Sequence, residues 1–397
     1  MGPAADLTLR GVRVVDARGV VADGADVVVR GGRIEAVGTA PAPVGTVLEL
    51  AGRTVVPGLM NAHAHVSLDG SADPDVAFRS ETPSQRTIRS AARLRETLEA
   101  GVTTIRDVGG PASVLEIAAM VASGELPGPR MLAAGQVVTI TGGHGHWMGL
   151  ESDGPDAARR AARLNIKGGA TAIKLMATGG MMTSGRQAGV PQLTIEEMAA
   201  AVEEAHKRGF PVGAHAESKT GVMNALHAGV DSIEHGHGGD AETIELMLRT
   251  GQFLVPTILS DRRIIDGGVA AGIPAEVVEQ CEALHELLVT FLRDAIRAGV
   301  KVAAGNDGGA PLVQNGEMVA ELQLYVDHGM TPLQALASGT TVTAELFRLP
   351  DVGLVEPGYA ADLLVVDGDP VASVAALEAP RLVIQAGRVA IDRSSRD

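Results

Sequence analysis

Apolar and polar positions change their pattern along this chain, and residues 5–56 show the first pattern. Short β-branched runs alternate there with Gly and Asp turns, as in Asp26–Arg30, the Gly31-Gly32 pair and Arg33–Val37. Two β-rich runs joined by Gly-Gly are typical of a hairpin. No helical period occurs in this segment. The pattern therefore predicts a small all-β unit.

From Pro57 onward, strand-like apolar runs alternate with helical stretches. The runs are the one that ends at His63-Ala64-His65 and those at 102–107, 131–134, 170–176, 210–215, 230–235, 253–257 and 300–307. Helical patterns lie between them at 86–100, 111–123, 155–168, 194–208, 219–228, 240–250 and 275–298. This alternation is typical of βα units around a parallel sheet. Eight such units favour a (β/α)8 TIM barrel over a doubly wound sheet, which usually has fewer strands.

The β pattern returns after the last two helical stretches, at 317–328 and 332–346. Asp362–Val366 and Leu382–Gln385 resemble the N-terminal strands in composition. We therefore predict an α/β protein with two domains. Residues 57–351 form the barrel, and residues 1–56 and 352–397 pair into a small β-sandwich built from both ends of the chain.

Composition narrows the range of partners. The chain has 397 residues and a net charge of −15, which argues against nucleic acid or an anionic membrane as a partner, because both require basic patches. The single cysteine, Cys281, excludes an intramolecular disulfide and suits a reducing compartment. Neither a leader peptide nor a membrane-spanning window is visible. We expect a cytoplasmic protein with a small-molecule substrate, and a homo-oligomer is an open alternative to a monomer.

Polar residues gather at the ends of the predicted strands. His63 and His65 share one face of an extended strand, because residues i and i+2 point the same way, and two imidazoles form a partial metal site. Each histidine alone is also compatible with a structural or surface role. The number of such polar residues at strand ends is nevertheless large, and the active sites of TIM barrels lie at the carboxyl ends of the strands. We therefore favour a metal site built from His63, His65, Lys174, His215, His235 and Asp307.

Lys174 lies in an apolar strand, Ile173-Lys174-Leu175. A buried amine is costly unless it is paired or neutral. One interpretation is a buried ion pair. The other is that the neutral amine takes up CO2 and becomes a carbamate, whose two oxygens can bridge two divalent ions.

The combined motifs resemble the amidohydrolase superfamily over essentially the whole chain, and most closely its imidazolonepropionase-like and prolidase-like branch. The matching segments are Pro57-Gly58-Leu59 through His65, Ile173–Leu175 with Gly179-Gly180, His215-Ala216, Ile233–Gly236, Gly305–Asp307 and Glu356–Leu363. The resemblance implies two metal ions, zinc by default with Mn, Co or Fe as alternatives. It implies His63, His65 and Asp307 on one ion, His215 and His235 on the other, and carboxylated Lys174 between them.

The resemblance also implies a reaction, hydrolysis of an amide-type C–N bond by a hydroxide held between the two ions. Asp307 would act as general base and acid, and His144 would donate a hydrogen bond to the developing oxyanion. Dipeptides or N-acyl amino acids are expected ahead of cyclic amides and ureas. The alternatives are a mononuclear imidazolonepropionase- or deaminase-like hydrolase and a non-catalytic scaffold on the same fold.

Substrate contacts are expected from the loops that follow the strands, at His144, His146, Trp147, Met181, Arg186 and Glu217. For the loop histidines and Trp147, solvation or loop packing is the alternative. Arg186 can bind a substrate carboxylate or stay solvated. Glu217 departs from the branch, whose peptidase-like members tend to carry a group such as Tyr there. A glutamate repels a carboxylate, so this position favours a neutral or cationic substrate unless a cation such as Arg186 compensates.

Overall fold

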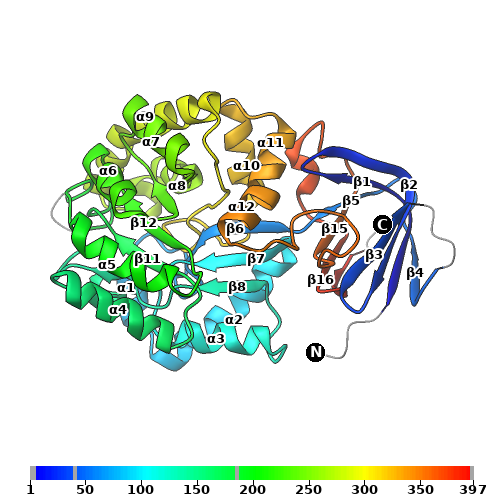
Figure 1. Cartoon of the computed structure of the whole chain (residues 1–397), viewed down its shortest axis with the longest axis horizontal. Helices are drawn as coiled ribbons and strands as arrows, with labels where there is room; N and C mark the ends of the chain where they lie inside the picture. Colours follow the sequence, from blue (N-terminus) through cyan, green and yellow to red (C-terminus); the bar gives the residue numbers. More distant parts are fainter. Residues whose placement is uncertain (1–5, 39–42, 184–186, 394–397) are drawn as a thin grey trace.

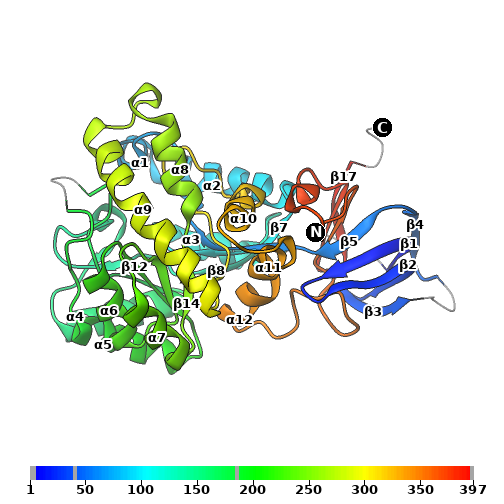
Figure 2. The same ribbon diagram turned by 90° about the horizontal axis from the view of Figure 1, so that it is seen from above.

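A computed structural model describes residues 6–38, 43–183 and 187–393. It shows an α/β protein in which helices surround parallel strands, with a β unit to one side (Figure 1). Figure 2 shows the same β unit beyond the helical part when the molecule is seen from above. In the described part, no helix has both the length and the apolar character needed to cross a membrane.

The two ends of the chain build one mixed sheet, in the order β17-β16-β15-β5-β1-β2-β3, with β4 paired to β1. Its strands are β1 Leu7–Asp16, β2 Gly19–Arg30, β3 Arg33–Gly38, β4 Thr46–Glu49, β5 Thr54–Pro57, β15 Leu363–Val366, β16 Leu382–Gln385 and β17 Arg388–Asp392. The predicted hairpin is present, since Arg30 pairs with Arg33. Antiparallel pairing of β15 with β5 joins the two ends. The predicted pairing of the ends is thus confirmed, whereas their packing as a two-layered sandwich stays a prediction.

Two parallel sheets follow. One has the order β6-β7-β8 and the other β10-β9-β11-β12-β13-β14. Their strands are β6 Leu59–Ala64, β7 Val102–Asp107, β8 Arg130–Ala133, β9 Val138–Thr139, β10 Leu150–Glu151, β11 Ile173–Met176, β12 Val212–Ala216, β13 Ser232–His235 and β14 Phe253–Val255. Backbone hydrogen bonds from Thr171 and Ala172 to Ala133 connect the two sheets. The predicted parallel α/β architecture is confirmed, and the closed eight-stranded barrel stays a prediction.

The predicted eighth strand at 300–307 is wrong as a regular strand. Val302 forms only an isolated parallel bridge with Leu254 of β14. The backbone around Val302 forms hydrogen bonds with different elements. The Leu254 N–H of β14 donates to the Lys301 carbonyl oxygen, and the Ala62 N–H of β6 donates to the Ala304 carbonyl oxygen. The segment therefore lies between β14 and β6 without forming a continuous ladder with either.

The helices follow the predicted periodicity closely. They are α1 Pro74–Ser80, α2 Pro83–Glu99, α3 Ser113–Ala122, α4 Pro155–Lys167, α5 Ile195–His206, α6 Lys219–Ala228, α7 Ala241–Thr250, α8 Ile258–Gly267, α9 Ala275–Ala298, α10 Met318–Asp327, α11 Pro332–Ala337 and α12 Thr343–Leu346, with a π-helix at Ser338–Val342 between the last two. Thr194 and Glu197 form the capping box that opens α5, as the sequence predicts. Helices α1 and α8 were not predicted. The main core between helices and strands is built from Val, Leu, Ile, Ala and Met side chains, with few aromatic ones.

Candidate metal centre

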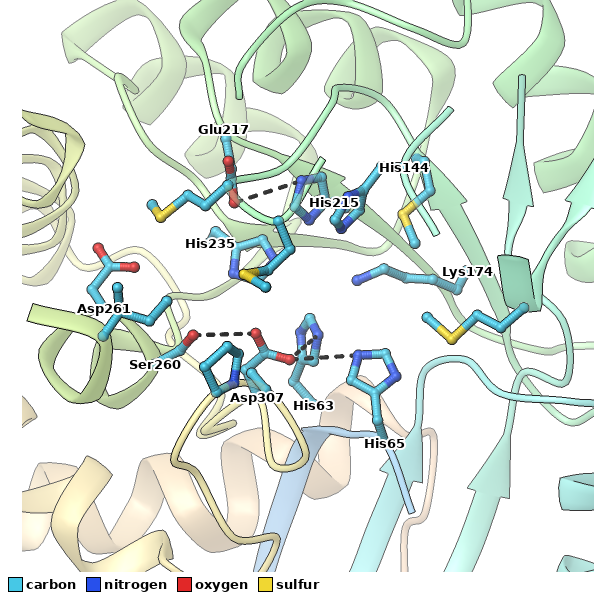
Figure 3. A pocket seen from close by; sticks show the side chains of 17 residues that line it. His63, His65, His144, Lys174, His215, Glu217, His235, Ser260, Asp261 and Asp307 are labelled. Atoms are coloured by element: carbon cyan, nitrogen blue, oxygen red, sulfur yellow. Dashed lines mark hydrogen bonds and ion pairs between the residues drawn. The ribbon is translucent and has the colours of Figure 1, made fainter. Parts of the chain in front are cut away.

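Strand ends bring the predicted ligands to one place. His63 lies near the end of β6 and His65 directly after it, while His215 and His235 lie at the ends of β12 and β13. All four imidazoles are buried. Parallel strands have their carboxyl ends at the same edge of a sheet, and Figure 3 shows these side chains around one pocket. The convergence follows from the topology.

His63, His65 and Asp307 form the first group of possible metal ligands. The Nε2 atoms of His63 and His65 lie 3.3 and 3.4 Å from Asp307 Oδ1. The other ring nitrogens are engaged, since His63 Nδ1 lies 2.8 Å from Glu234 Oε2 and His65 Nδ1 lies 2.8 Å from the Gly109 carbonyl oxygen. A proton on Nδ1 leaves the Nε2 lone pair free for a metal ion, the usual arrangement of histidine ligands.

His215, His235 and Glu217 form the second group, with ligand atoms within 4.8 Å of one another. His235 Nδ1 is hydrogen-bonded to Thr257 Oγ1 at 2.7 Å, and His215 Nε2 lies 3.7 Å from Glu217 Oε1. The ring centroids of His63 and His235 are 5.1 Å apart. The two groups are therefore neighbours in one site.

Lys174 extends from β11 toward both groups (Figure 3). Its side chain is 1% exposed, and Nζ has no hydrogen-bond partner. Burial lowers the pKa of Lys174 to about 8, against the opposing influence of Glu234 and Asp307. No ion-pair contact to this amine occurs among the described residues, so the buried ion pair considered from the sequence is not formed.

Two carboxyl groups in the site are held in different states. Burial alone would raise the pKa of Asp307, but the neighbouring His63 and His65 hold it well below its ordinary value. Burial raises the pKa of Glu217 to about 8, with nearby His237 opposing and Asp261 and Asp307 reinforcing the shift. Asp307 is thus held in its ionised form by its histidine neighbours, whereas burial outweighs the charge of His237 at Glu217.

His144 reaches the pocket from the glycine-rich loop between β9 and β10. Its Nδ1 is hydrogen-bonded to Thr183 Oγ1 at 2.7 Å, and its ring stacks on His215 with centroids 4.4 Å apart. Burial, followed by the charge of Lys174, lowers the pKa of His144 to about 4. The alternative of a fully solvated loop histidine is therefore wrong.

The remaining predicted substrate contacts have different surroundings. Met181 is buried and lines the pocket beside Glu217. His146 is exposed and Trp147 half-buried, and both line an adjoining cavity in which the Trp147 ring packs on Phe78. Arg186 lies outside the described residues.

The pocket consists of two connected parts. The inner pocket contains both groups of possible ligands and Lys174. Its lining also includes Glu217 and Asp261 (Figure 3) and the buried pair Met181 and Ile264, which pack in one cluster; we call these four residues the acidic end. The outer pocket is lined by Leu68, Pro74, Asp75, residues 142–147 and Thr183. Both parts share His65, His144, Met148, Met182, Asp307, Ala310 and Pro311. A substrate that occupies both must therefore pass Asp307.

Sequence reasoning missed two groups of residues that shape the site. Ser260 and Asp261 are on the unpredicted α8, and Ser260 Oγ lies 3.3 Å from Asp307 Oδ2. Glu234 accepts from Arg106 Nη2 at 2.7 Å while it holds His63. Glu234 directly precedes the predicted ligand His235, and a charged residue inside a buried strand is the signal that could have identified it.

The other histidines and the cysteine have structural surroundings. His237, left undecided from the sequence, and His285 both contact the buried carboxylate of Asp261, at 3.1 and 3.3 Å. Burial raises the pKa of the Cys281 thiol well above its ordinary value, which keeps this cysteine protonated and unreactive.

Histidine and carboxylate groups at the ends of parallel strands, with a buried lysine between them, are the features of a metal-dependent hydrolase site. The chain matches the model of the amidohydrolase family over residues 54–390. It belongs to this family, and the predicted membership and enzyme class, a hydrolase acting on C–N bonds, are confirmed.

Individual relatives agree with this assignment. Ochratoxinase from Aspergillus niger is 31% identical over 362 residues, which cover 83% of this chain and 73% of the relative. A crystal structure of an Xaa-Pro dipeptidase with bound methionine is similar with a TM-score of 0.87 and 29% identity, covering 97% of this chain and 99% of the other. A prolidase complexed with N-methylphosphonate-L-proline gives a TM-score of 0.89 and 29% identity, covering 98% and 100%.

Proposed function

We propose that this protein is a binuclear metal-dependent hydrolase that cleaves the amide bond of dipeptides or N-acyl amino acids. One observation carries the proposal: the unpartnered amine of Lys174 is buried between two neighbouring groups of metal-ligand side chains. The relatives support the substrate class, because one is named as an Xaa-Pro dipeptidase, one as a prolidase and one as ochratoxinase.

The side chains of the site fit two divalent ions. His63, His65 and Asp307 would hold one ion, and His215 and His235 the other. Imidazole and carboxylate donors suit zinc first, with Mn, Co or Fe as alternatives. The proposed fold around them is a closed (β/α)8 barrel over residues 57–351, beside a β-sandwich of residues 1–56 and 352–397.

Lys174 would complete the site as a carbamate. A neutral amine attacks CO2, the N–C bond forms, and one proton leaves to water. The product has two oxygens and one negative charge, so it can contact both ligand groups. Burial supports this chemistry because it favours the neutral amine, which is the reactive form. An amine that stayed protonated would instead repel the ions.

The ions, when bound, would supply a hydroxide at neutral pH and polarise the substrate carbonyl. Side chains of the protein would transfer the proton and stabilise the developing charge. Asp307, whose Oδ2 also faces Ser260, would take the proton of the attacking hydroxide and pass it to the leaving nitrogen. His144, with Nδ1 bound to Thr183, would donate from Nε2 to the carbonyl oxygen as negative charge develops there.

The proposal is tested by metal analysis and by the variant Lys174→Ala. We expect about two ions per chain in the purified protein, and in the variant a loss of metal and activity that formate or acetate partly restores. Lys301→Ala is the matched control, because Lys301 is an exposed lysine paired with Glu345. It should keep both metal and activity.

Other metal contents would contradict the proposal in different ways. About one ion per chain with full activity in Lys174→Ala would favour the mononuclear imidazolonepropionase- or deaminase-like alternative. No bound ion and no hydrolysis of any amide by protein incubated with zinc, manganese or cobalt would favour the non-catalytic scaffold.

A further inference from the structure

The acidic end of the inner pocket contains two buried carboxyl groups in different environments. Glu217 is 5% exposed and Asp261 4%. Asp261 Oδ2 contacts His237 Nε2 and His285 Nδ1, so its charge is matched within the protein. Glu217 is less fully matched: the Met181 backbone N–H donates to it and His237 acts on it from nearby, but Oε1 lies 3.7 Å from His215 and Oε2 makes no hydrogen bond. One carboxylate oxygen in the pocket is therefore left without a donor.

A buried polar atom in a pocket usually has a partner, and the free Glu217 Oε2 can take a hydrogen-bond donor or a cation from a bound group. Among the described residues that line the inner pocket, Lys174 is the one lysine and no arginine occurs. Figure 3 shows Glu217 and Asp261 on the side of the pocket away from Lys174. No described lysine or arginine of the pocket lies on that side, which leaves the Glu217 carboxyl open to a cation from a bound molecule.

The walls beside Glu217 indicate the shape of that molecule. Met181 and Ile264 are apolar and buried, they belong to one hydrophobic cluster, and both line the pocket. A chain of methylene groups with a charge at its tip matches apolar walls that end at a carboxylate. At the other end, the outer pocket presents Leu68, Pro74 and Trp147. These side chains fit an apolar or aromatic group.

We propose that Glu217 binds a cationic group, amine or guanidinium, that the substrate presents on an aliphatic side chain. The substrate class is then an amide that joins a lysine-like or arginine-like residue to an apolar acyl group, with the scissile bond near Asp307. This inference rests on the proposed function, since it assigns a substrate to the same site. The inference predicts that the protein selects its substrate by the charge at the side-chain tip rather than by the size of the side chain.

The test compares three substrates that differ only at the side-chain tip: N-benzoyl-L-lysine, N-benzoyl-L-norleucine and N-benzoyl-L-2-aminoadipate. We expect kcat/KM for the lysine compound to exceed that for norleucine at least tenfold, which equals about 1.4 kcal/mol, with aminoadipate slowest. In Glu217→Gln the preference for lysine should fall below about threefold. Asp75→Asn is the matched control, because Asp75 lines the outer pocket and the preference should persist there.

Two further measurements make every outcome decisive. If none of the amides is hydrolysed, the proposed function fails, and charge selection is then read from calorimetric binding of lysinamide against norleucinamide. Equal binding, or equal turnover of the lysine and norleucine compounds, overturns the inference. Metal content is measured in Glu217→Gln as well. Retained metal with a lost preference supports the inference, whereas loss of metal identifies Glu217 as a metal ligand and overturns it.

Discussion

Glu234 connects Arg106 and Ser232 to His63 of the first group of possible ligands in one buried hydrogen-bond network. Replacement of Glu234 by Gln removes one negative charge with little change in shape. Glu234 is fully buried on β13. Its Oε2 accepts from His63 Nδ1 at 2.8 Å, and its Oε1 accepts from Arg106 Nη2 at 2.7 Å and from Ser232. Burial alone would raise the pKa of Glu234, but Arg106 and His63 hold this pKa well below its ordinary value.

The size of the effect follows from these contacts. A glutamine amide offers one acceptor and one donor group where two acceptors are needed, so it opposes either Arg106 or His63. Arg106 is 1% exposed, and a buried pair broken on one side typically costs about 3–5 kcal/mol because the remaining charge is uncompensated. A histidine ligand that loses its orienting acceptor typically loses about 10–100-fold in metal affinity.

Two assays measure these effects separately. Urea unfolding of the metal-free protein gives the free energy of unfolding, and competition with a chromogenic chelator gives the metal affinity. We expect Glu234→Gln to lose about 3 kcal/mol or more in the first assay and at least tenfold in the second. The control Asp351→Asn removes an exposed pair with Arg33 and should cost less than about 1 kcal/mol.

A double variant distinguishes charge from ligand orientation. Arg106→Met with Glu234→Leu leaves neither charge in the core, so most of the stability should return. Metal affinity should stay low, because His63 still lacks its acceptor. The reasoning is refuted if Glu234→Gln changes the free energy of unfolding by less than about 1 kcal/mol, which is the range of exposed pairs, or leaves metal affinity unchanged.

Two further predictions concern other parts of the chain. Arg163, Lys207 and Arg159 hold the pKa of Glu204 at about 2, below the ordinary value expected in the unfolded chain. The stabilisation that ionised Glu204 provides is therefore complete above about pH 4.5 and is lost as the pH falls toward 2. The difference in Tm between the native protein and Glu204→Gln should shrink across that pH range. A constant difference in Tm would contradict this account. A Cβ on Gly180 would lie 2.5 Å from His144 Cε1, so Gly180→Ala should displace the imidazole and lower kcat by more than about tenfold at unchanged fold by circular dichroism. Normal turnover in that variant would argue against the proposed role of His144.

Most helices could be predicted because their signals are local. Gly and Pro mark their ends, and the capping box at Thr194 is readable within four residues. The positions of His63, His215 and His235 at strand ends could be predicted for the same reason, since each follows an apolar run directly. Their convergence needed one further assumption, that the strands are parallel, which the topology supports.

Helix α8 could not be predicted because its start depends on a distant residue. No side chain of its own first turn caps it. Instead Glu321, more than sixty positions later, accepts from the backbone N–H groups of Ile258 and Leu259 at 2.9 and 2.7 Å. Asp261 and Ser260 reach the pocket only because this helix begins directly after β14. The part of the acidic end that α8 contributes, Asp261 and Ile264, therefore could not be predicted from local sequence patterns.

Backbone conformation explains why strand register alone did not locate every side chain of the site. Of the seven described non-glycine residues with positive φ, three lie where strands meet the pocket: His235 at 67°, Thr257 at 51° and Asp307 at 56°. Such conformations cost about 1–3 kcal/mol each and persist where the surrounding contacts hold them. His235 and Thr257 hold each other through their hydrogen bond, and Asp307 is held by His63 and His65. Contacts among the side chains of the site and their neighbours thus fix this strained backbone, so the geometry of the proposed ligands depends on the local fold.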